Sequence, residues 1–402
     1  MRIESPVAAL GSQAKVRRDL ILDAIRGLCL ALMTVNHLPG NWLQQYTFHA
    51  FGIIGDREIF VFLSGFVAAW LYGRAWERNG AGAFLACVFK GIGRIYLVSM
   101  ALTFTLMLAT ELGGSRLADW RELVFYPGLS WQENLLSVVT FRHTIVFITM
   151  LRFYAVLLCV FPLIMYGLRR RQEALVLAIA GAIWLAIQCI IAPHLAGVSK
   201  GMLPLVRIVA WQPIYALGAM AGYRRAIGAP SLVPKWRWMI WASGGIAGIF
   251  FWVRHPLMDL AAVSRLASAH SWIMEDRTLG PLRLLNFLGV VTVAAYLLRR
   301  HAAAIVNLPP CRWLAYLGRH SIYVFAASMV TSYFGFLFRH GWAAAQNKSQ
   351  PAFILACLLS LWLAAAGHER VSQIRKARRR PARAALPRSP HAMPSPRQAV
   401  LS

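Results

Sequence analysis

An apolar stretch interrupted by a few polar residues occupies positions 20–38, LILDAIRGLCLALMTVNHL. It is long enough to cross a bilayer as a helix, which takes about 17–25 residues. A basic segment precedes it, as in a secretory signal peptide, but Asp23 and Arg26 interrupt the apolar run and no small-residue cleavage site follows. We therefore interpret it as the first of several retained membrane helices.

Similar stretches recur along the whole chain of 402 residues, which is 58% hydrophobic and only 14% charged, with a mean hydropathy of +0.54. Such values lie outside the usual range of soluble domains. The pattern predicts an all-α polytopic membrane protein with about ten transmembrane helices, at 20–38, 59–73, 92–112, 143–168, 174–192, 204–222, 238–254, 281–298, 314–338 and 351–367.

Basic residues outnumber acidic ones by 42 to 15, which gives a net charge of +27. Most of them lie in the segments that share one side of the membrane with the N-terminus, so the positive-inside rule predicts that both termini are cytoplasmic. This distribution explains the charge without a nucleic-acid partner. We expect location in a bacterial inner membrane, as a multi-pass protein.

The chain divides into a cytoplasmic N-terminal segment, 1–19, a membrane domain, 20–367, and a basic cytoplasmic tail, 368–402. The tail is rich in Arg, Pro, Ser and Ala and has few bulky apolar residues, which predicts disorder. The six cysteines form no CxxC pair, so we expect neither a disulfide framework nor a metal site.

Ionisable side chains are costly inside a membrane, and the first predicted helix has three of them. Arg26 and His37 are eleven residues apart, which places them within about 20° of one helix face and roughly 16 Å apart along the axis. Asp23 can hold the Arg26 guanidinium through an i, i+3 pair. Such a face suits a phosphate-bearing donor near Arg26 and a general base, His37, farther out.

The same residues also have a purely structural interpretation. Asp23 and Arg26 can form an ion pair that only stabilises the helix, and His37 can be a capping or core histidine beside Pro39. Spacing alone leaves both interpretations open.

Further polar residues accompany the later helices. Asp56 and Glu58 precede FLSGF, residues 62–66, where they could orient His37 or position an acceptor, and Ser64 with Gly65 suggests close helix packing. Lys90 and Arg94, one turn apart, could bind phosphate or act as anchors at the cytoplasmic surface.

Three arginines fall in or beside predicted helices, with few intramembrane acids to neutralise them: Arg152, Arg207 and Arg319. A buried Arg without an acid implies an anionic ligand, such as the diphosphate of CoA or a free carboxylate of the acyl group, unless the side chain extends to the interface. Amide and indole groups complete the set of candidate residues: Trp211, Gln212 and Asn286.

Several of these motifs together resemble a known family. The Arg26–His37 spacing, FLSGF and KGIGRIY, residues 90–96, occur in the order found in the acyltransferase-three superfamily of membrane acyltransferases. A closer resemblance is to the OpgC family, which succinylates osmoregulated periplasmic glucans. Its motifs are similar to EIFVFLSGF at 58–66, AWQ at 210–212 with LG at 217–218, PLRLLNF at 281–287 and LGRHSIYVF at 317–325.

The resemblance implies a ten-helix fold in which His37 is the catalytic base, Arg26 and Arg94 lie near acyl-CoA, and a periplasmic glycan hydroxyl is the acceptor. Acyl-CoA, in particular succinyl-CoA, would be a co-substrate, and no permanently bound cofactor is expected. The chain departs from the family in ITMLRFY, residues 148–154, where Thr149 and Arg152 replace a typical Asp and Pro. This departure leaves the identity of the acceptor open.

Three alternatives remain at the level of the sequence. The enzyme could transfer an acetyl or other acyl group to a lipid-linked or surface polysaccharide. A secondary transporter would also contain intramembrane Arg and His, although no paired interrupted helices are visible. A structural membrane subunit would bind no acyl-CoA.

Overall fold

Helices make up all the regular secondary structure that the computed structural model describes, namely residues 20–140, 145, 148–198, 202–234, 236–255, 271–344 and 350–384. The predicted N-terminal segment 1–19 lies outside the described residues. The helices are α1 Leu20–His37, α2 Asp56–Gly113, α3 Ala118–Val124, α4 Trp131–Val139, α5 Thr149–Arg169, α6 Glu173–Ala186, α7 Leu203–Ala226, α8 Arg237–Arg254, α10 Pro281–Arg300, α11 Ala302–Asn307, α12 Pro309–Arg319, α13 Ser321–Ala344 and α14 Gln350–Ala384.

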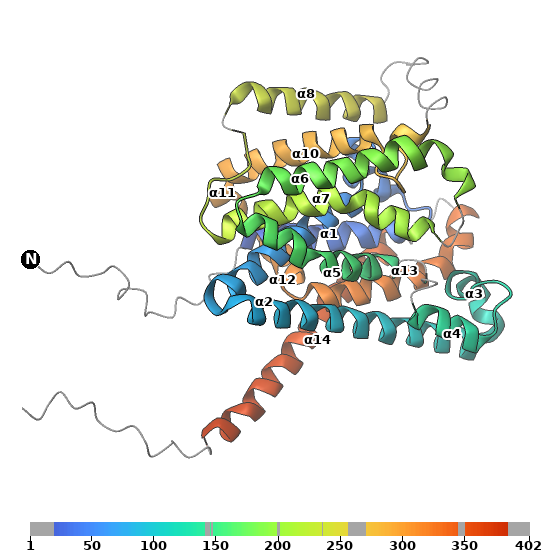
Figure 1. Cartoon of the computed structure of the whole chain (residues 1–402). Helices are drawn as coiled ribbons and strands as arrows, with labels where there is room; N and C mark the ends of the chain where they lie inside the picture. The colour runs from blue at the N-terminus through green and yellow to red at the C-terminus, as the bar shows by residue number, and fades with distance from the viewer. Residues whose placement is uncertain are drawn as a thin grey trace, which may run out of the picture.

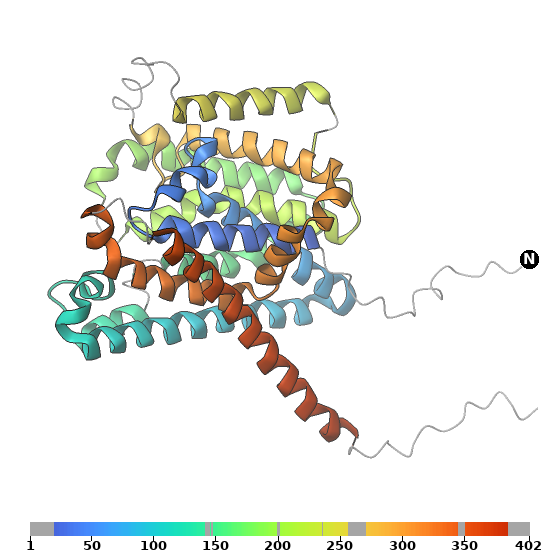
Figure 2. The same cartoon turned by 180° about the vertical axis from the view of Figure 1, so that it is seen from behind.

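Most of the long helices lie roughly side by side in a bundle (Figure 1), with α1 surrounded by the others. We call the two ends of this bundle the Leu20 end and the His37 end, after the first and last residues of α1. Figure 2 shows the same arrangement from behind, with α3 and α4 at the His37 end and α11 at the Leu20 end. The last part of α14 extends away from the bundle toward the Leu20 end.

The 58-residue α2 is two antiparallel arms rather than one rod. Its helical geometry is broken at Gly80, which has a φ of 80° that favours glycine. The rings of Trp76 and Phe84 lie 4.4 Å apart, and Tyr72 lies against Gly91, a pair that a straight helix would separate by about 28 Å. The first arm, 56–79, and the second arm, 81–113, therefore correspond to the two separate spans predicted at 59–73 and 92–112.

Glycines bring two pairs of helices into backbone contact. Gly65 of α2 and Gly218 of α7 face the partner helix so closely that an added Cβ would overlap a backbone oxygen, that of Tyr215 and that of Phe62. Gly27 of α1 meets α12 in the same way. Small residues allow this approach where lipid provides no hydrophobic drive for helix association. The glycine of the FLSGF motif thus serves the close contact between α2 and α7.

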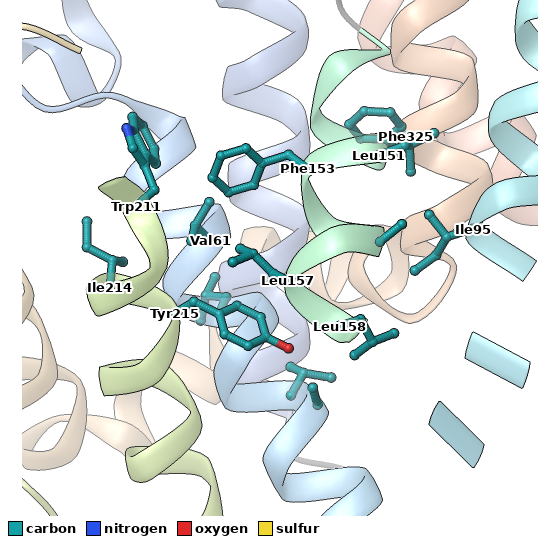
Figure 3. Packing of buried hydrophobic residues seen from close by; sticks show 14 of the residues in the cluster. Val61, Ile95, Leu151, Phe153, Leu157, Leu158, Trp211, Ile214, Tyr215 and Phe325 are labelled. Atoms are coloured by element: carbon teal, nitrogen blue, oxygen red, sulfur yellow. The ribbon is translucent and has the colours of Figure 1, made fainter. Parts of the chain in front are cut away.

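Large apolar side chains fill the centre of the bundle. Figure 3 shows Val61, Phe153, Leu157 and Tyr215 converging from α2, α5 and α7, and Tyr215 is fully buried. The ring of Phe153 meets that of Trp211 edge to face, with centroids 5.9 Å apart. These contacts fix the relative positions of the helices that carry the candidate site.

Seven of the described helices are long and apolar enough to cross a membrane, with a shorter apolar segment at Ser321–Phe336 in addition. The protein is therefore an all-α membrane protein. Each of the ten predicted spans overlaps at least one helix.

Four features differ from the prediction. The segment 113–142, between two predicted spans, includes the helices α3 and α4, and the expected span 314–338 is divided between α12 and α13 at His320. The span predicted from 143 begins as α5 only at Thr149, after positions that lie partly outside the described residues.

The fourth difference concerns the tail. Helix α14 continues to Ala384, so 368–384 is helical where disorder was predicted. The reason is that Glu, Arg, Lys, Gln and Ala, which give this segment a polar composition, are also strong helix formers that extend a helix already nucleated in the bundle. Residues 385–402 lie outside the described residues.

Candidate active site

Helix α1 carries Arg26 in its first half and His37 as its last residue, and both side chains lie within electrostatic reach of the first arm of α2. Arg26 is within electrostatic reach of Tyr72 on that arm, and His37 is within reach of Asp56 and Arg57 at its start. Arg26 also donates a hydrogen bond from Nη2 to Ser321 Oγ, at 2.5 Å. Arg26 and His37 are therefore each within electrostatic reach of the same arm of α2.

A hydrogen-bond chain fixes the surroundings of His37. Asp56 is 5% exposed and accepts a hydrogen bond from Asn36 Nδ2, at 3.0 Å. Asn36 Oδ1 in turn accepts one from the Thr47 hydroxyl, at 2.8 Å. Thr47 separates the short helices η2 (Trp42–Tyr46) and η3 (Phe48–Phe51), so this chain holds the α1–α2 connection against the end of α1.

Glu58 lies two residues farther into α2 than Asp56 and is fully buried. Its Oε1 lies 2.5 Å from Nη1 of Arg283 on α10, and its Oε2 accepts the backbone N–H of Gly55, at 2.9 Å. A buried carboxylate with a guanidinium and a backbone donor is well satisfied. Glu58 therefore ties α2 to α10.

A second ion-pair cluster surrounds Asp276, in the connection before α10. Asp276 Oδ2 lies 2.8 Å from Arg57 Nη1 and 3.4 Å from Arg207 Nη2. Burial raises the pKa of Asp276. A hydrogen bond with the Glu275 side chain and the nearby guanidiniums lower this pKa by a larger amount, so that it is about 2. The Asp276 carboxylate is thus charged at neutral pH and links α2 to α7.

Three predicted residues support this end of the bundle through hydrogen bonds. Asn286 accepts the N–H of Ile53 and donates to the carbonyl of Phe51, while Trp211 Nε1 donates to the backbone oxygen of Asp276, at 2.8 Å. Gln212 instead donates to Ala180 of α6, at 2.8 Å, so its described contact is between helices and outside the cluster. Ser64 is buried in α2, also outside it.

The Leu20 end gathers three of the predicted donor residues, whereas the fourth, Arg152, lies at the His37 end near the start of α5, so its predicted place beside the donor phosphates is wrong. Asp23 Oδ2 lies 3.8 Å from Arg319 Nε, and Arg94 lies over the ring of Tyr323, with Nη2 3.4 Å from the phenol oxygen. Lys90 is exposed on the second arm of α2, one turn from Arg94. These basic groups surround the end of α1 that carries Arg26.

The expectation that Arg207 and Arg319 lack acidic partners within the protein is wrong. Arg207 pairs with Asp276 and Arg319 with Asp23. Both acids were visible in the sequence, but the pairing of Arg207 depends on a connection that folds back over the helix ends. The lack of an acidic partner is therefore no argument for a bound anion at these two arginines.

Two cavities accompany these clusters. The larger, about 830 Å³, lies between α13, α14 and the second arm of α2 and is mostly apolar, with Tyr323 and His368 in its wall. The smaller, about 250 Å³, lies at the His37 end and has Arg152, Arg207 and Arg277 in its wall. Neither of the two is lined by Arg26 or His37.

Some site residues were missed from the sequence. Asn36 and Thr47 are uncharged, Asp276 lies outside the predicted spans, and Arg57 and Arg283 are not among the predicted site residues. For Arg283 a signal existed, because a basic residue in the first turn of a span, at the end opposite to the basic segments, calls for an acidic partner. No cluster of three or more His, Cys, Asp or Glu suited to a metal occurs within the described part of the chain.

Most of the chain, including the candidate site, resembles a known protein family. Comparison with curated proteins and with solved structures gives no match. Residues 18–373, which include all of the candidate site, match the family described as OpgC protein. The chain therefore belongs to the OpgC protein family, and this membership implies a glucan-modifying acyltransferase.

Proposed function

We propose that the protein transfers a succinyl group from cytoplasmic acyl-CoA to a hydroxyl of a periplasmic glycan, such as an osmoregulated periplasmic glucan. It does so as a multi-pass protein of a bacterial inner membrane, with the Leu20 end in the cytoplasm. The observation that carries the proposal is the placement of Arg26, in the first half of α1, and His37, at its end, within electrostatic reach of one arm of α2.

The donor binds at the Leu20 end. Its phosphates contact the basic residues there that are free of a carboxylate in the described structure, namely Arg94, which contacts Tyr323, and the exposed Lys90, together with Arg26. Guanidiniums bind phosphate through paired hydrogen bonds, and lysine contributes a mobile point charge. CoA is a co-substrate in this scheme and no cofactor stays bound. Arg319, already neutralised by Asp23, positions α12 against α1.

Chemistry takes place at the His37 end. The acceptor hydroxyl oxygen attacks the thioester carbonyl while an imidazole nitrogen of His37 removes its proton, an ester bond forms, and the thiolate of CoA leaves and takes up the proton. Asp56 lies within electrostatic reach of His37 and is fixed by Asn36, so its carboxylate stabilises the imidazolium that forms during attack. Arg57 or backbone N–H groups stabilise the oxyanion.

The acceptor enters at the His37 end from the periplasm, along the α1–α2 connection. Glu58 and Asn286 hold this connection in place from α2 and α10, which makes them positioning residues. A runner-up, transfer of another acyl group to a surface polysaccharide, uses the same site and differs only in substrates.

Mass spectrometry of periplasmic and surface glycans tests the proposal. Cells that produce the protein should contain glycans heavier by one or more acyl groups than cells without it, and the mass increment identifies the acyl group. Identical glycan masses in both strains, with the protein present in the membrane, would refute the proposal.

Proteoliposomes separate the enzyme from a transporter. An acyltransferase should release CoA only when acceptor glycan is present on the other side of the membrane. Net uptake of a substrate without an acceptor and without acyl transfer would favour transport instead.

A further inference from the structure

The smaller cavity at the His37 end has a strongly basic wall. Three guanidiniums line it, from Arg152 of α5, Arg207 of α7 and Arg277 of the connection before α10. Among the described residues that line it there is no carboxylate, and the remaining wall is Thr149 and apolar side chains. A cavity of this kind has a charged part and an apolar part.

The carboxylates behind this wall do not balance its charge. Asp276 contacts Arg207 and is shared with Arg57, while Glu275 Oε1 lies 3.9 Å from Arg277 Nε. Asp276 and Glu275 therefore contact three guanidiniums, those of Arg57, Arg207 and Arg277. These contacts leave a surplus of positive charge beside a partly enclosed site, which favours an anion.

Helix geometry adds to the same effect. Helices α5 and α7 both begin at the cavity, at Thr149 and Leu203, and neither N-terminus has a side-chain capping hydrogen bond. The first turn of a helix presents unpaired N–H groups and the positive end of the helix dipole. The positive ends of these two helices therefore add to the positive potential of the three guanidiniums.

We infer that this cavity binds a carboxylate or phosphate group of a substrate. Its volume of about 250 Å³ is below the ~300–1,000 Å³ of pockets that enclose a whole drug-sized ligand, so it takes one charged group and its immediate neighbours. The apolar wall, with Phe153 and Ile208, suits methylene groups or one face of a sugar ring.

The cavity is connected to the proposed base through shared ion pairs. Arg57 pairs with the same Asp276 carboxylate as Arg207 and lies within electrostatic reach of His37. An anion bound here would hold its parent molecule beside His37. The role in transfer rests on the proposed function, whereas the binding of the anion does not.

Binding measurements on the purified full-length protein carrying H37A test the inference without turnover. The probes are succinate with neutral succinamide as its control, and glucose 6-phosphate with glucose as its control. Each charged probe should stabilise the protein against heat more than its neutral counterpart. R152Q and R277Q should each weaken binding of the charged probe roughly tenfold or more, as expected for the loss of a charged hydrogen bond.

A matched control is R121Q, because Arg121 lies at the same end of the bundle, pairs with Glu111 and does not line the cavity. It should bind the charged probes as the parent protein does. Arg277 is half exposed, so R277Q keeps the test valid if R152Q impairs folding.

The result also identifies the source of the anion. Stronger binding of succinate indicates the free carboxylate of the acyl group, and stronger binding of glucose 6-phosphate indicates a phosphate on the acceptor. Equal binding of charged and neutral probes, absence of binding, or equal weakening in R121Q would overturn the inference. None of these outcomes bears on the role of His37, which is tested by acyl transfer.

Discussion

Glu58 shows at the scale of a single residue how the site depends on buried charge. It is fully buried, and Arg283, its partner on α10, has a side chain only 14% exposed. Removing one member of a buried pair leaves the other charge without compensation, which costs about 3–5 kcal/mol. Glu58→Gln should therefore destabilise the protein by about that amount, measured by denaturation of the purified protein in detergent.

The double variant Glu58→Gln with Arg283→Met is the control for this prediction. It removes both charges and should recover most of the lost stability. If Glu58→Gln alone is as stable as the original protein, the pair contributes nothing to the His37 end.

Asp276 predicts a pH dependence of stability. Burial raises its pKa, but Glu275 and the neighbouring guanidiniums lower this pKa by a larger amount. The result is a pKa of about 2, below the ordinary value of about 3.9. The folded state therefore binds this proton less readily than the unfolded state, so the stabilisation is complete above about pH 4 and is lost as the pH falls toward 2. The thermal unfolding midpoints of the protein and of Asp276→Asn should differ at pH 7. This difference should shrink as the pH falls from 4 toward 2. A constant difference across this range would contradict the assignment.

Residue spacing predicted part of this site. It placed Arg26 and His37 on one face because both lie on a single regular helix, where sequence distance determines geometry. It did not predict that Glu58 meets Arg283, 225 positions away, or that Asp276 lies between Arg57 and Arg207. Such pairs depend on how helices pack, which one sequence does not specify.

At the scale of helices, glycine contacts make a matched comparison possible. An added Cβ at Gly218 would overlap the Phe62 carbonyl across the α2–α7 contact, whereas at Gly245 of α8 it would meet nothing within 4 Å. Overpacking costs about 1–3 kcal/mol or more, while an unhindered Gly→Ala change in a helix gains up to ~1 kcal/mol. Gly218→Ala should lower the unfolding midpoint and Gly245→Ala should leave it unchanged or raise it.

The opposite ranking, or equal effects of the two changes, would show that α2 and α7 do not approach as closely as the structure has them. Gly218→Ala should lower activity together with stability, because Gly218 contacts the arm of α2 that begins with Asp56.

Hydropathy predicted the positions of the long helices because apolar length is a property of the sequence itself. It failed at places where the backbone turns without a change in composition. The backbone divides α12 from α13 at His320 inside one predicted span, and α14 continues through a polar segment that favours helix, whereas the break at Gly80 falls between two predicted spans. These features follow from local backbone geometry and helix propensity.

For the whole molecule, the alternation of helices predicts which surfaces face each compartment. Gln132 lies on α4 at the His37 end, and Leu232 lies in the α7–α8 connection at the Leu20 end. A cysteine introduced at 132, in a protein whose native cysteines are replaced, should react with a membrane-impermeant reagent in intact spheroplasts. A cysteine at 232 should react only after permeabilisation. The reverse pattern would place the basic segments outside.

The family was identified from four ordered motifs, and its match to residues 18–373 confirms that resemblance. The motifs combine two kinds of residue. Gly65 and Gly218 serve helix packing, whereas Glu58 and Asn286 hold the connection next to His37. The sequence identifies the set, and only the structure separates packing from positioning.

The role of His37 is tested most directly by acyl transfer with the reconstituted protein. Rates from acyl-CoA to periplasmic glycan should be compared for His37→Ala and for His194→Ala, an exposed histidine at the same end of the bundle. Loss of a general base lowers rates by about 10²–10⁴-fold. We predict a loss of that size for His37→Ala, with unchanged folding, and a normal rate for His194→Ala. A normal rate for His37→Ala would contradict the proposed mechanism.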